Sequence, residues 1–506
     1  MRASLNVFSS FTAGIWAAAV GLLVLPVYLR YLGIESFGLV GFLLTLQAWF
    51  LLLDMGLSPT SSREMARYSG GQHSAQGIRD LFTSFEYVYA GLGMLLALAL
   101  VAGSRWLATD WLQLKSLGVD DAARALSWMA VMVAVQWMGT LYRSAINGLQ
   151  QQVWLGGLTV AMASLRALGT LAVLAWIAPT LDAFVLAQTA SFLLEAALMR
   201  WYLHRRLPAA RGRFRPQALK AVWQFAAGMT AIAVLSTLLN QMDKLLLARL
   251  LTLEQFGYFS LAMTVIGAMA IVVTPIFNAA YPRLAELVAS DQEPLLAGEY
   301  HAFSQIAAFT ILPIAATLLL FAPEAIYAWT GDRQLTAYVA PIVSVWAVGS
   351  ALNGLMHVPY ALQLAIGWVR VSIVLNVVAV AVMLPSILLL VPRYGAVAAG
   401  WIWAIVNLFY FTAGVFVMHR RVLPAQARRW YVRDLGIPCA AILACMLVAL
   451  GARSWLQPEG RGASAALVAA ALLASGLCAL LATPTGRALA GAAARAVRSR
   501  HAVARQ

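Results

Sequence analysis

Apolar stretches of roughly 20 residues, separated by short segments rich in Arg, Gly and Pro, run through the whole chain of 506 residues. A helix of about 20 residues is long enough to cross the hydrocarbon core of a bilayer. Hydrophobic residues make up 62% of the chain and charged residues only 11%, too few to cover a water-soluble protein of this size. The sequence therefore predicts an integral membrane protein built from transmembrane helices.

Fourteen of these stretches are long enough to be membrane spans. They lie near residues 8–29, 37–58, 81–103, 123–142, 155–178, 183–203, 221–247, 256–278, 303–322, 336–357, 370–391, 396–418, 435–451 and 464–482. The connections between them are too short to hold a soluble domain. We expect an all-α polytopic fold of about 14 helices, with any function inside the membrane-embedded bundle.

The basic residues fall unevenly on the two sides of these spans. With a cytoplasmic N-terminus, 24 of the 35 Lys and Arg residues lie in cytoplasmic segments, Arg143 among them, and nine lie on the other side. Arg166 and Lys244 remain within spans. Cytoplasmic loops are normally enriched in Lys and Arg, so the pattern predicts that both termini are cytoplasmic. Basic loops against anionic lipid headgroups also explain the net charge of +15 without a nucleic-acid partner.

A short motif occurs twice, each time between two predicted spans on the outer side. Residues 30–38 (Arg-Tyr-Leu-Gly-Ile-Glu-Ser-Phe-Gly) match residues 249–257 (Arg-Leu-Leu-Thr-Leu-Glu-Gln-Phe-Gly) at Arg, Leu, Glu, Phe and Gly. Six predicted spans separate the copies, so both run in the same direction. The repeat predicts two pseudo-symmetric six-helix bundles, residues 1–215 and 216–425, with substrate handled between them. Residues 426–506 would add two helices and a basic cytoplasmic tail.

The motif and its surroundings resemble the polysaccharide-transport branch of the multidrug/oligosaccharidyl-lipid/polysaccharide (MOP) flippase superfamily. The matching residues are Leu32-Gly33-x-x-x-Phe37-Gly38, Asp54-x-Gly56-Leu57, Arg63, Gln241-x-Asp243 and Phe256-Gly257-Tyr258. Span number, orientation and duplication fit as well, so the resemblance covers essentially the whole chain. These short motifs identify the superfamily better than the substrate.

The resemblance implies a transporter whose two bundles open to alternate sides. Wzx-type O-antigen flippases of this branch move undecaprenyl-diphosphate-linked sugars to the outer leaflet of the bacterial inner membrane. We therefore expect a lipid-linked oligosaccharide as substrate, membrane lipids as surroundings, and a polysaccharide polymerase and a chain-length regulator as partners. Three alternatives stay open: a cation-coupled exporter of drugs or other small molecules in the same superfamily, a membrane enzyme of envelope assembly, and a non-transporting scaffold.

Four cations are candidates for binding the substrate diphosphate, because ionisable side chains inside a bilayer are costly and are usually functional. Arg166 lies in the middle of its predicted span, on a small and partly polar face. Its alternative role is a structural pair with a carboxylate of a neighbouring helix. Lys244 adjoins Asp243, and the two could neutralise each other. Arg30 and Arg249 occupy equivalent places in the repeat, where reaching to the headgroups is the alternative.

Four acids are candidates for ion coupling. They are Asp54, Glu86, Asp243 and Glu195, all within predicted spans. Helical spacing would place Gln47, Asp54 and Ser58 on one polar face of the second span. A buried carboxyl group can carry a proton, although each of these acids could equally be a structural ion-pair partner.

Motifs for catalysis or for a bound cofactor are absent from the sequence. It contains neither a Gly-x-x-x-x-Gly-Lys-Ser/Thr phosphate loop nor a His-Glu-x-x-His or Gly-x-Ser-x-Gly signature. Its three cysteines all lie in late apolar stretches and do not form a metal-ligand set. We therefore expect a protein that is not an enzyme and needs no cofactor or metal.

Overall fold

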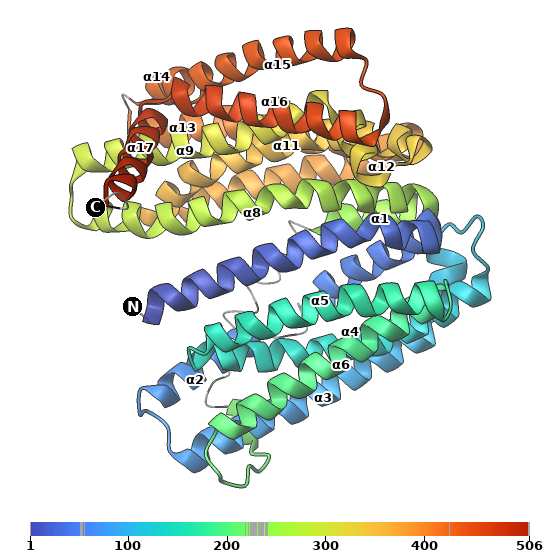
Figure 1. Ribbon diagram of the computed structural model, residues 1–506. Helices are drawn as coiled ribbons and strands as arrows, with labels where there is room; N and C mark the ends of the chain where they lie inside the picture. The colour runs from blue at the N-terminus through green and yellow to red at the C-terminus, as the bar shows by residue number, and fades with distance from the viewer. Residues whose placement is uncertain are drawn as a thin grey trace. The chain divides into compact units, whose positions relative to one another are not determined.

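The computed structural model describes residues 2–50, 54, 56–217, 219, 220, 222, 230, 237, 241–424 and 426–503. Across these residues the chain is helical, with one isolated β-bridge between Gln113 and Thr252 (Figure 1). Eleven of the described helices are long and apolar enough to cross a membrane. The predicted all-α membrane fold is confirmed. The count of about 14 spans stays a prediction, and most of the predicted span 221–247 lies outside the described residues.

The helices follow one another with short connections. In the first half they are α1 (Arg2–Phe50), α2 (Leu57–Ser69), α3 (Ala75–Trp106), η2 (Leu107–Trp111), α4 (Val119–Gly148), α5 (Gln152–Trp176) and α6 (Leu181–Arg206). Residues 241–250 are also helical. Then come α8 (Leu253–Ala289), α9 (Glu293–Leu320), α10 (Ala322–Thr330), α11 (Arg333–Ala365), α12 (Val369–Phe409), η3 (Tyr410–Gly414), α13 (Val415–Val422), α14 (Ala427–Arg429), η4 (Trp430–Gly436), α15 (Ile437–Leu456), α16 (Gly460–Ala482) and α17 (Pro484–Val503).

Two of the longest helices are each interrupted by one glycine. Gly33 breaks α1 at φ 77°, and Gly395 breaks α12 at φ 66°. Positive φ values of this kind cost glycine little because it lacks a Cβ atom. Both breaks fall between two predicted spans, so each long helix consists of two helical pieces joined at a kink.

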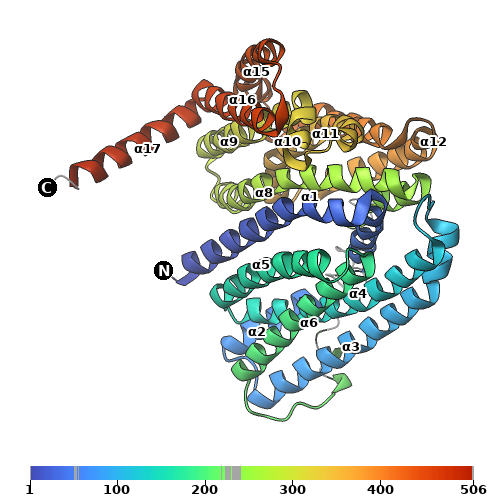
Figure 2. The same ribbon diagram turned by 45° about the vertical axis from the view of Figure 1, so that its right-hand side comes forward.

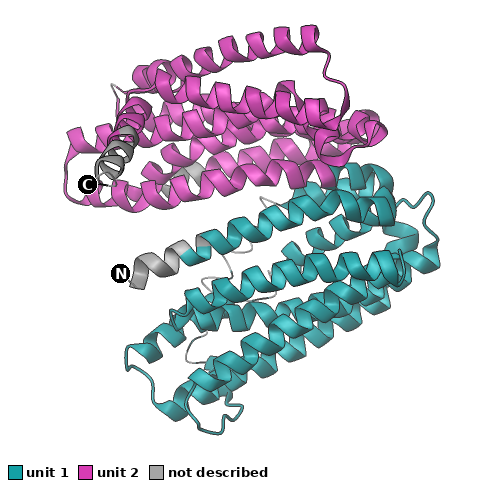
Figure 3. Ribbon diagram, in the orientation of Figure 1, with its two compact units in different colours: residues 1–260 teal, residues 261–506 magenta. Residues whose placement is uncertain are grey.

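The chain forms two compact units, residues 1–260 and 261–506, and the division falls within α8 (Figure 3). In unit 1, α4 packs against both α3 and α6, while α1 packs against α5. The core around α3 and α4 is aromatic and aliphatic, with Phe82, Phe85, Tyr89 and Leu141 all buried.

In unit 2, α11 packs against α9 and α12. Helix α16 packs against α9, α10 and α15, and α15 packs against α9. Phe321, Ile442 and Met446 form the core under the C-terminal pair of helices. Figure 2 shows α17 continuing from the end of α16 as a separate straight helix. The predicted segments 1–215, 216–425 and 426–506 follow the sequence repeat rather than packing, and they stay a prediction.

The two copies of the repeated motif contact each other within unit 1. A Cβ atom added to Gly38 would collide with the carbonyl oxygen of Leu253 and approach the amide nitrogen of Gly257. A Cβ atom on Gly257 would in turn collide with the carbonyl oxygen of Ile34. The contact is reciprocal, as expected for two related motifs, and it needs glycine at both positions because backbone meets backbone.

The end of the predicted span 37–58 differs from expectation. Helix α1 is described as far as Phe50, and α2 begins at Leu57 after Gly56, which has φ 67°. The left-handed residue Gly56 interrupts regular helical spacing before Ser58, so the predicted helical face does not extend to Ser58. Residues 51–53 and 55, between Gln47 and Ser58, lie outside the described residues. Gln47 donates to Gln136 of α4 at 2.8 Å.

Candidate functional site

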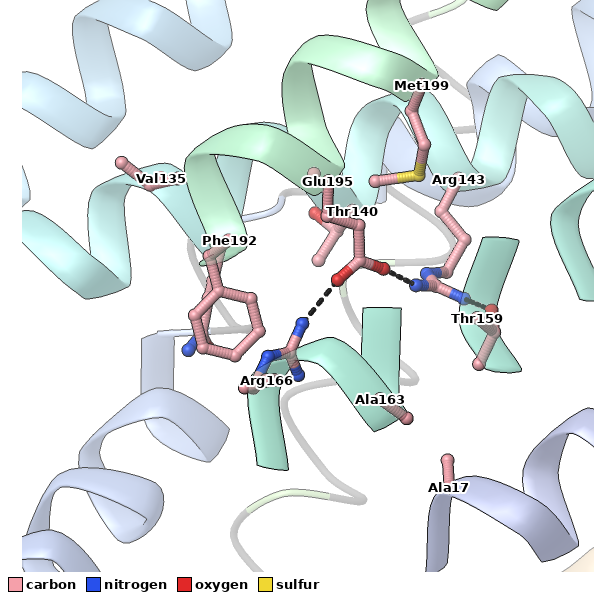
Figure 4. Close-up of a pocket in the computed structure, with 12 residues that line it drawn as sticks. Ala17, Val135, Thr140, Arg143, Thr159, Ala163, Arg166, Phe192, Glu195 and Met199 are labelled. Atoms are coloured by element: carbon pink, nitrogen blue, oxygen red, sulfur yellow. Dashed lines mark hydrogen bonds and ion pairs between the residues drawn. The ribbon is translucent and has the colours of Figure 1, made fainter. Parts of the chain in front are cut away.

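A cavity of about 240 Å³ lies in unit 1 among α1, α4, α5 and α6 (Figure 4). Its lining consists of Ala17, Val135, Gln136, Gly139, Thr140, Arg143, Thr159, Ala163, Arg166, Phe192, Glu195 and Met199. The charged members are two arginines and one glutamate, so the lining carries one net positive charge. A cationic cavity between helices of a membrane protein is a candidate site for an anionic group.

Two helices each supply a polar stripe to this cavity. Gln136, Thr140 and Arg143 are spaced i, i+4, i+7 along α4. Thr159, Ala163 and Arg166 have the same spacing along α5. Side chains at this spacing lie on one face of a helix, so each stripe turns its polar groups the same way.

Glu195 of α6 joins the two stripes. One of its carboxylate oxygens accepts from Nη2 of Arg143, and the other accepts from Nη2 of Arg166 (Figure 4). Glu195 is 6% exposed, whereas the side chains of Arg143 and Arg166 are 40% and 23% exposed. The carboxylate is thus buried between two guanidinium groups that remain partly open.

Further contacts fix both arginines in place. Nη1 of Arg143 donates to the hydroxyl of Thr159 at 3.1 Å. The guanidinium of Arg166 lies 3.6 Å from the centre of the Phe192 ring, a cation–π contact. Its buried Nε has no hydrogen-bond partner among the described residues. The arrangement therefore presents oriented cations with spare N–H donors, which suits a phosphate group.

Arg166 pairs with a carboxylate of a neighbouring helix, as one of its two predicted roles requires, and it also lines the cavity. Its role in binding the substrate stays a prediction. The predicted span ended before Arg143, but α4 continues to Gly148, so Arg143 lies within the helix and lines the cavity. Its predicted place on the cytoplasmic side stays a prediction. The predicted span ended at residue 142 where the apolar run ended. The i, i+4, i+7 stripe of Gln136, Thr140 and Arg143 was the signal that could have revealed this site residue.

Lys244 and Asp243 lie outside the cavity lining. Nζ of Lys244 donates to Gln241 at 3.0 Å. Asp243 is buried, and its Oδ1 has no hydrogen-bond partner among the described residues. The structure thus gives Lys244 an amide partner one helical turn away, and the substrate and coupling roles of this pair stay predictions.

Arg30 and Arg249 also lie outside the cavity lining, and both side chains are exposed. The backbone carbonyl of Arg249 accepts from Nε2 of Gln113 at 3.0 Å. Exposure beside the Gly38–Gly257 contact fits the headgroup alternative for these arginines, and their predicted substrate role remains open.

Asp54 and Glu86 are held in polar clusters away from the cavity. Asp54 accepts from the backbone N–H and the hydroxyl of Ser58, at 3.1 and 2.9 Å, and from the hydroxyl of Tyr89. Glu86 accepts from Tyr142 at 3.0 Å and contacts Arg200 and His204, each at 3.1 Å. Both carboxylates therefore have several partners outside the cavity. Of the four predicted coupling acids, only Glu195 belongs to the cavity lining.

A metal site is not apparent in the part of the chain that the structure describes. Within it, His, Cys, Asp and Glu do not come together in groups of three or more that could hold an ion. The cavity offers guanidinium, hydroxyl and amide groups instead. Its chemistry is therefore that of anion binding.

The sequence matches the family model described as "Polysaccharide biosynthesis protein" over residues 4–288, more than half of the chain. The chain belongs to this family. A relative from Shigella flexneri named "Putative O-antigen transporter" is 20% identical over 378 residues, which cover 74% of this chain and 88% of the relative.

Solved structures share the fold of this polysaccharide biosynthesis protein. The lipid II flippase MurJ in an inward closed conformation has a TM-score of 0.67 at 13% identity, over 94% of this chain and 98% of MurJ. An inward-facing MATE multidrug transporter of the MOP superfamily has a TM-score of 0.64 at 13% identity, over 83% and 98%. The family match and the eleven membrane-length helices make this chain a multi-pass membrane protein of the polysaccharide biosynthesis family, with the fold of MurJ and MATE transporters.

Proposed function

We propose that this protein flips a polyprenyl-diphosphate-linked oligosaccharide from the inner to the outer leaflet of the bacterial inner membrane, for surface polysaccharide synthesis. The observation that carries the proposal is the pair of arginines, Arg143 and Arg166, in a cavity among helices that can span the membrane. The name of the Shigella flexneri relative supports it, because O-antigen is a surface polysaccharide.

The physical problem for such a substrate is its polar end. Sugars and a diphosphate cannot cross hydrocarbon unless other polar groups replace their hydration. Arg143 and Arg166 would bind the diphosphate through forked, charge-assisted hydrogen bonds. Thr159, Thr140 and Gln136 would offer further polar contacts from the same lining. The polyprenyl tail can stay in lipid.

A multidrug exporter of the same superfamily would have a different cavity. Cationic drugs favour an acidic lining, whereas two guanidinium groups and one carboxylate line this one. The shared fold with MATE transporters therefore does not favour that function here. Cytoplasmic termini and association with a polymerase and a chain-length regulator belong to the same proposal.

The first test is substitution of Arg166 in a strain that needs the protein for surface polysaccharide. Arg166→Ala should abolish surface polysaccharide and leave lipid-linked precursor on the inner leaflet. Arg166→Lys keeps the charge but loses the forked donors, so it should retain part of the function. The measurements are surface polysaccharide by immunoblot and precursor by lipid extraction.

Arg105→Ala is the matched control, because the Arg105 side chain is 78% exposed and lies outside the cavity lining. It should leave surface polysaccharide unchanged. Normal surface polysaccharide in Arg166→Ala cells, with the variant at wild-type abundance in the membrane, would show that Arg166 does not bind substrate.

A further inference from the structure

Glu195 occupies the place where an anionic substrate would bind. Its two oxygens contact Nη2 of Arg143 and Nη2 of Arg166, so the carboxylate bridges the two guanidinium groups (Figure 4). An incoming anion must compete with a buried carboxylate for the same donors. Competition of this kind decides which anions can bind, because specificity is a difference between two affinities.

We propose that Glu195 is a built-in counter-ion that the diphosphate of the substrate displaces, and that this displacement makes the site selective for diphosphates over monophosphates. The inference rests on the proposed function, since it assigns a role to Glu195 at the same arginines. It makes Glu195 a specificity-determining residue, beyond the ion-coupling role that its place in a span suggests.

The selectivity follows from the geometry of the two pairs. Arg143 of α4 and Arg166 of α5 each contact a separate oxygen of the Glu195 carboxylate, which therefore bridges two cations on different helices. A diphosphate diester carries one charge on each of two phosphorus centres, and each centre can take one arginine. It can replace both contacts of Glu195 at once.

A monophosphate concentrates its charge on one phosphorus centre. Bound to one arginine, it leaves the carboxylate on the other and lies close to that negative charge. Bound to both arginines, it has to displace Glu195 while its whole charge stays on one phosphorus centre, whereas the diphosphate places one charge at each guanidinium group. Like charges that are forced together in a buried site repel each other, so the monophosphate gains less than the diphosphate does.

The resting state also fits a counter-ion role. Without the carboxylate, two guanidinium groups would stand close together with no counter-charge, and their repulsion would cost free energy. The N–H of Nε of Arg166, unpartnered among the described residues, shows that Glu195 does not saturate the donors. The site is thus stable without substrate and still has capacity for an acceptor that brings more oxygens.

The test uses the purified full-length protein and two small probes that fit a cavity of about 240 Å³. P1,P2-dimethyl diphosphate carries two charges on two phosphorus centres. Methyl phosphate at pH 8 carries nearly the same total charge on one centre, because its second pKa is about 6. Isothermal titration calorimetry at low ionic strength measures both dissociation constants.

Wild-type protein should bind the diphosphate at least about tenfold tighter than the monophosphate, a difference of the size that one charge-assisted hydrogen bond supplies. Glu195→Gln should tighten binding of both probes and reduce their ratio by roughly tenfold, because a single phosphate can then bridge the arginines. Glu195→Asp keeps the charge on a shorter side chain and should give an intermediate ratio, which keeps the test valid if Glu195→Gln does not fold.

Glu293→Gln is the matched control, since Glu293 is exposed in the first turn of α9 and its removal changes the net charge equally. It should leave the ratio unchanged. Equal binding of the two probes by wild type, or a ratio unaltered in both Glu195 variants, would overturn the counter-ion role. Unchanged diphosphate binding by Arg143→Gln and Arg166→Gln would instead overturn the proposed substrate site, so the two failures are distinguishable.

Discussion

Replacement of Asp434 by alanine should loosen the attachment of the C-terminal helices, α15 and α16, to helix α9 within unit 2. Asp434 lies in η4, is completely buried, and accepts a hydrogen bond from Nε2 of Gln305 at 2.8 Å. Its other carboxylate oxygen contacts Nδ1 of His301, which is only 1% exposed. Gln305 and His301 both belong to α9, so Asp434 fastens the start of the C-terminal segment to that helix.

The magnitude follows from the two contacts that alanine removes. Each buried polar group left without a partner costs about 1–3 kcal/mol, so loss of both contacts should cost about 2–6 kcal/mol. Asparagine keeps one acceptor oxygen, so Asp434→Asn should cost less.

Hydrogen exchange of the purified protein is the assay, read by mass spectrometry on peptides from α9 and α15. A loss of about 2 kcal/mol or more corresponds to exchange at least about thirtyfold faster. Glu459→Ala is the control, because Glu459 is an exposed carboxylate at the start of α16. Wild-type exchange in the Asp434→Ala protein would refute the view that this cluster holds the C-terminal helices.

Two further predictions concern the repeat and the orientation. Gly38→Ala should destabilise the protein by about 1–3 kcal/mol, because the added Cβ atom would meet backbone atoms of Leu253 and Gly257. The control Gly91→Ala has open space around the added Cβ atom and should leave the unfolding midpoint unchanged or slightly higher. Equal unfolding midpoints for the Gly38→Ala and wild-type proteins would contradict the close contact. Reporter fusions after Leu207 should be cytoplasmic and fusions after Gly331 periplasmic; the opposite signals would contradict cytoplasmic termini.

The helical class of the fold could be predicted because membrane spans leave a signal in every stretch of about 20 residues. Gly33 and Gly395, which break α1 and α12, lie where the sequence already separates two spans. The start of α2 at Leu57 could not be located the same way. Apolar residues continue past Phe50, and hydrophobicity does not reveal a change in backbone conformation such as the one at Gly56.

The repeat predicted that residues 30–38 and 249–257 occupy equivalent positions, but a repeat does not show that its copies touch. Their contact through Gly38 and Gly257 depends on how α1 approaches the start of α8, which the periodicity of either helix alone does not determine. The spacing of Glu, Phe and Gly that both copies of the motif share was the sequence signal for this contact. Its physical cause, a backbone contact that excludes a Cβ atom, needed coordinates.

The candidate site was predictable one helix at a time. Arg166 was found because a lone cation in an apolar span on a small, polar face is unusual. Glu195 was found as an isolated acid, and its pairing with Arg166 joins residues 29 positions apart on different helices. Arg143 was missed because hydropathy ends a span at the first charge, whereas a helix that turns this charge into a cavity simply continues.

The two roles considered for Arg166, a structural ion pair and substrate binding, do not exclude each other. A charged side chain within a span costs about 2.5–3.5 kcal/mol on insertion scales, so cations kept for an anionic substrate need a partner while the substrate is absent. A partner that satisfied every donor would close the site. Glu195 contacts one nitrogen of each arginine and leaves other donors open, so the same carboxylate can stabilise the empty cavity and yield to a stronger acceptor. An ion pair inside a transporter is therefore consistent with substrate binding when its carboxylate is buried and its guanidinium groups are partly exposed.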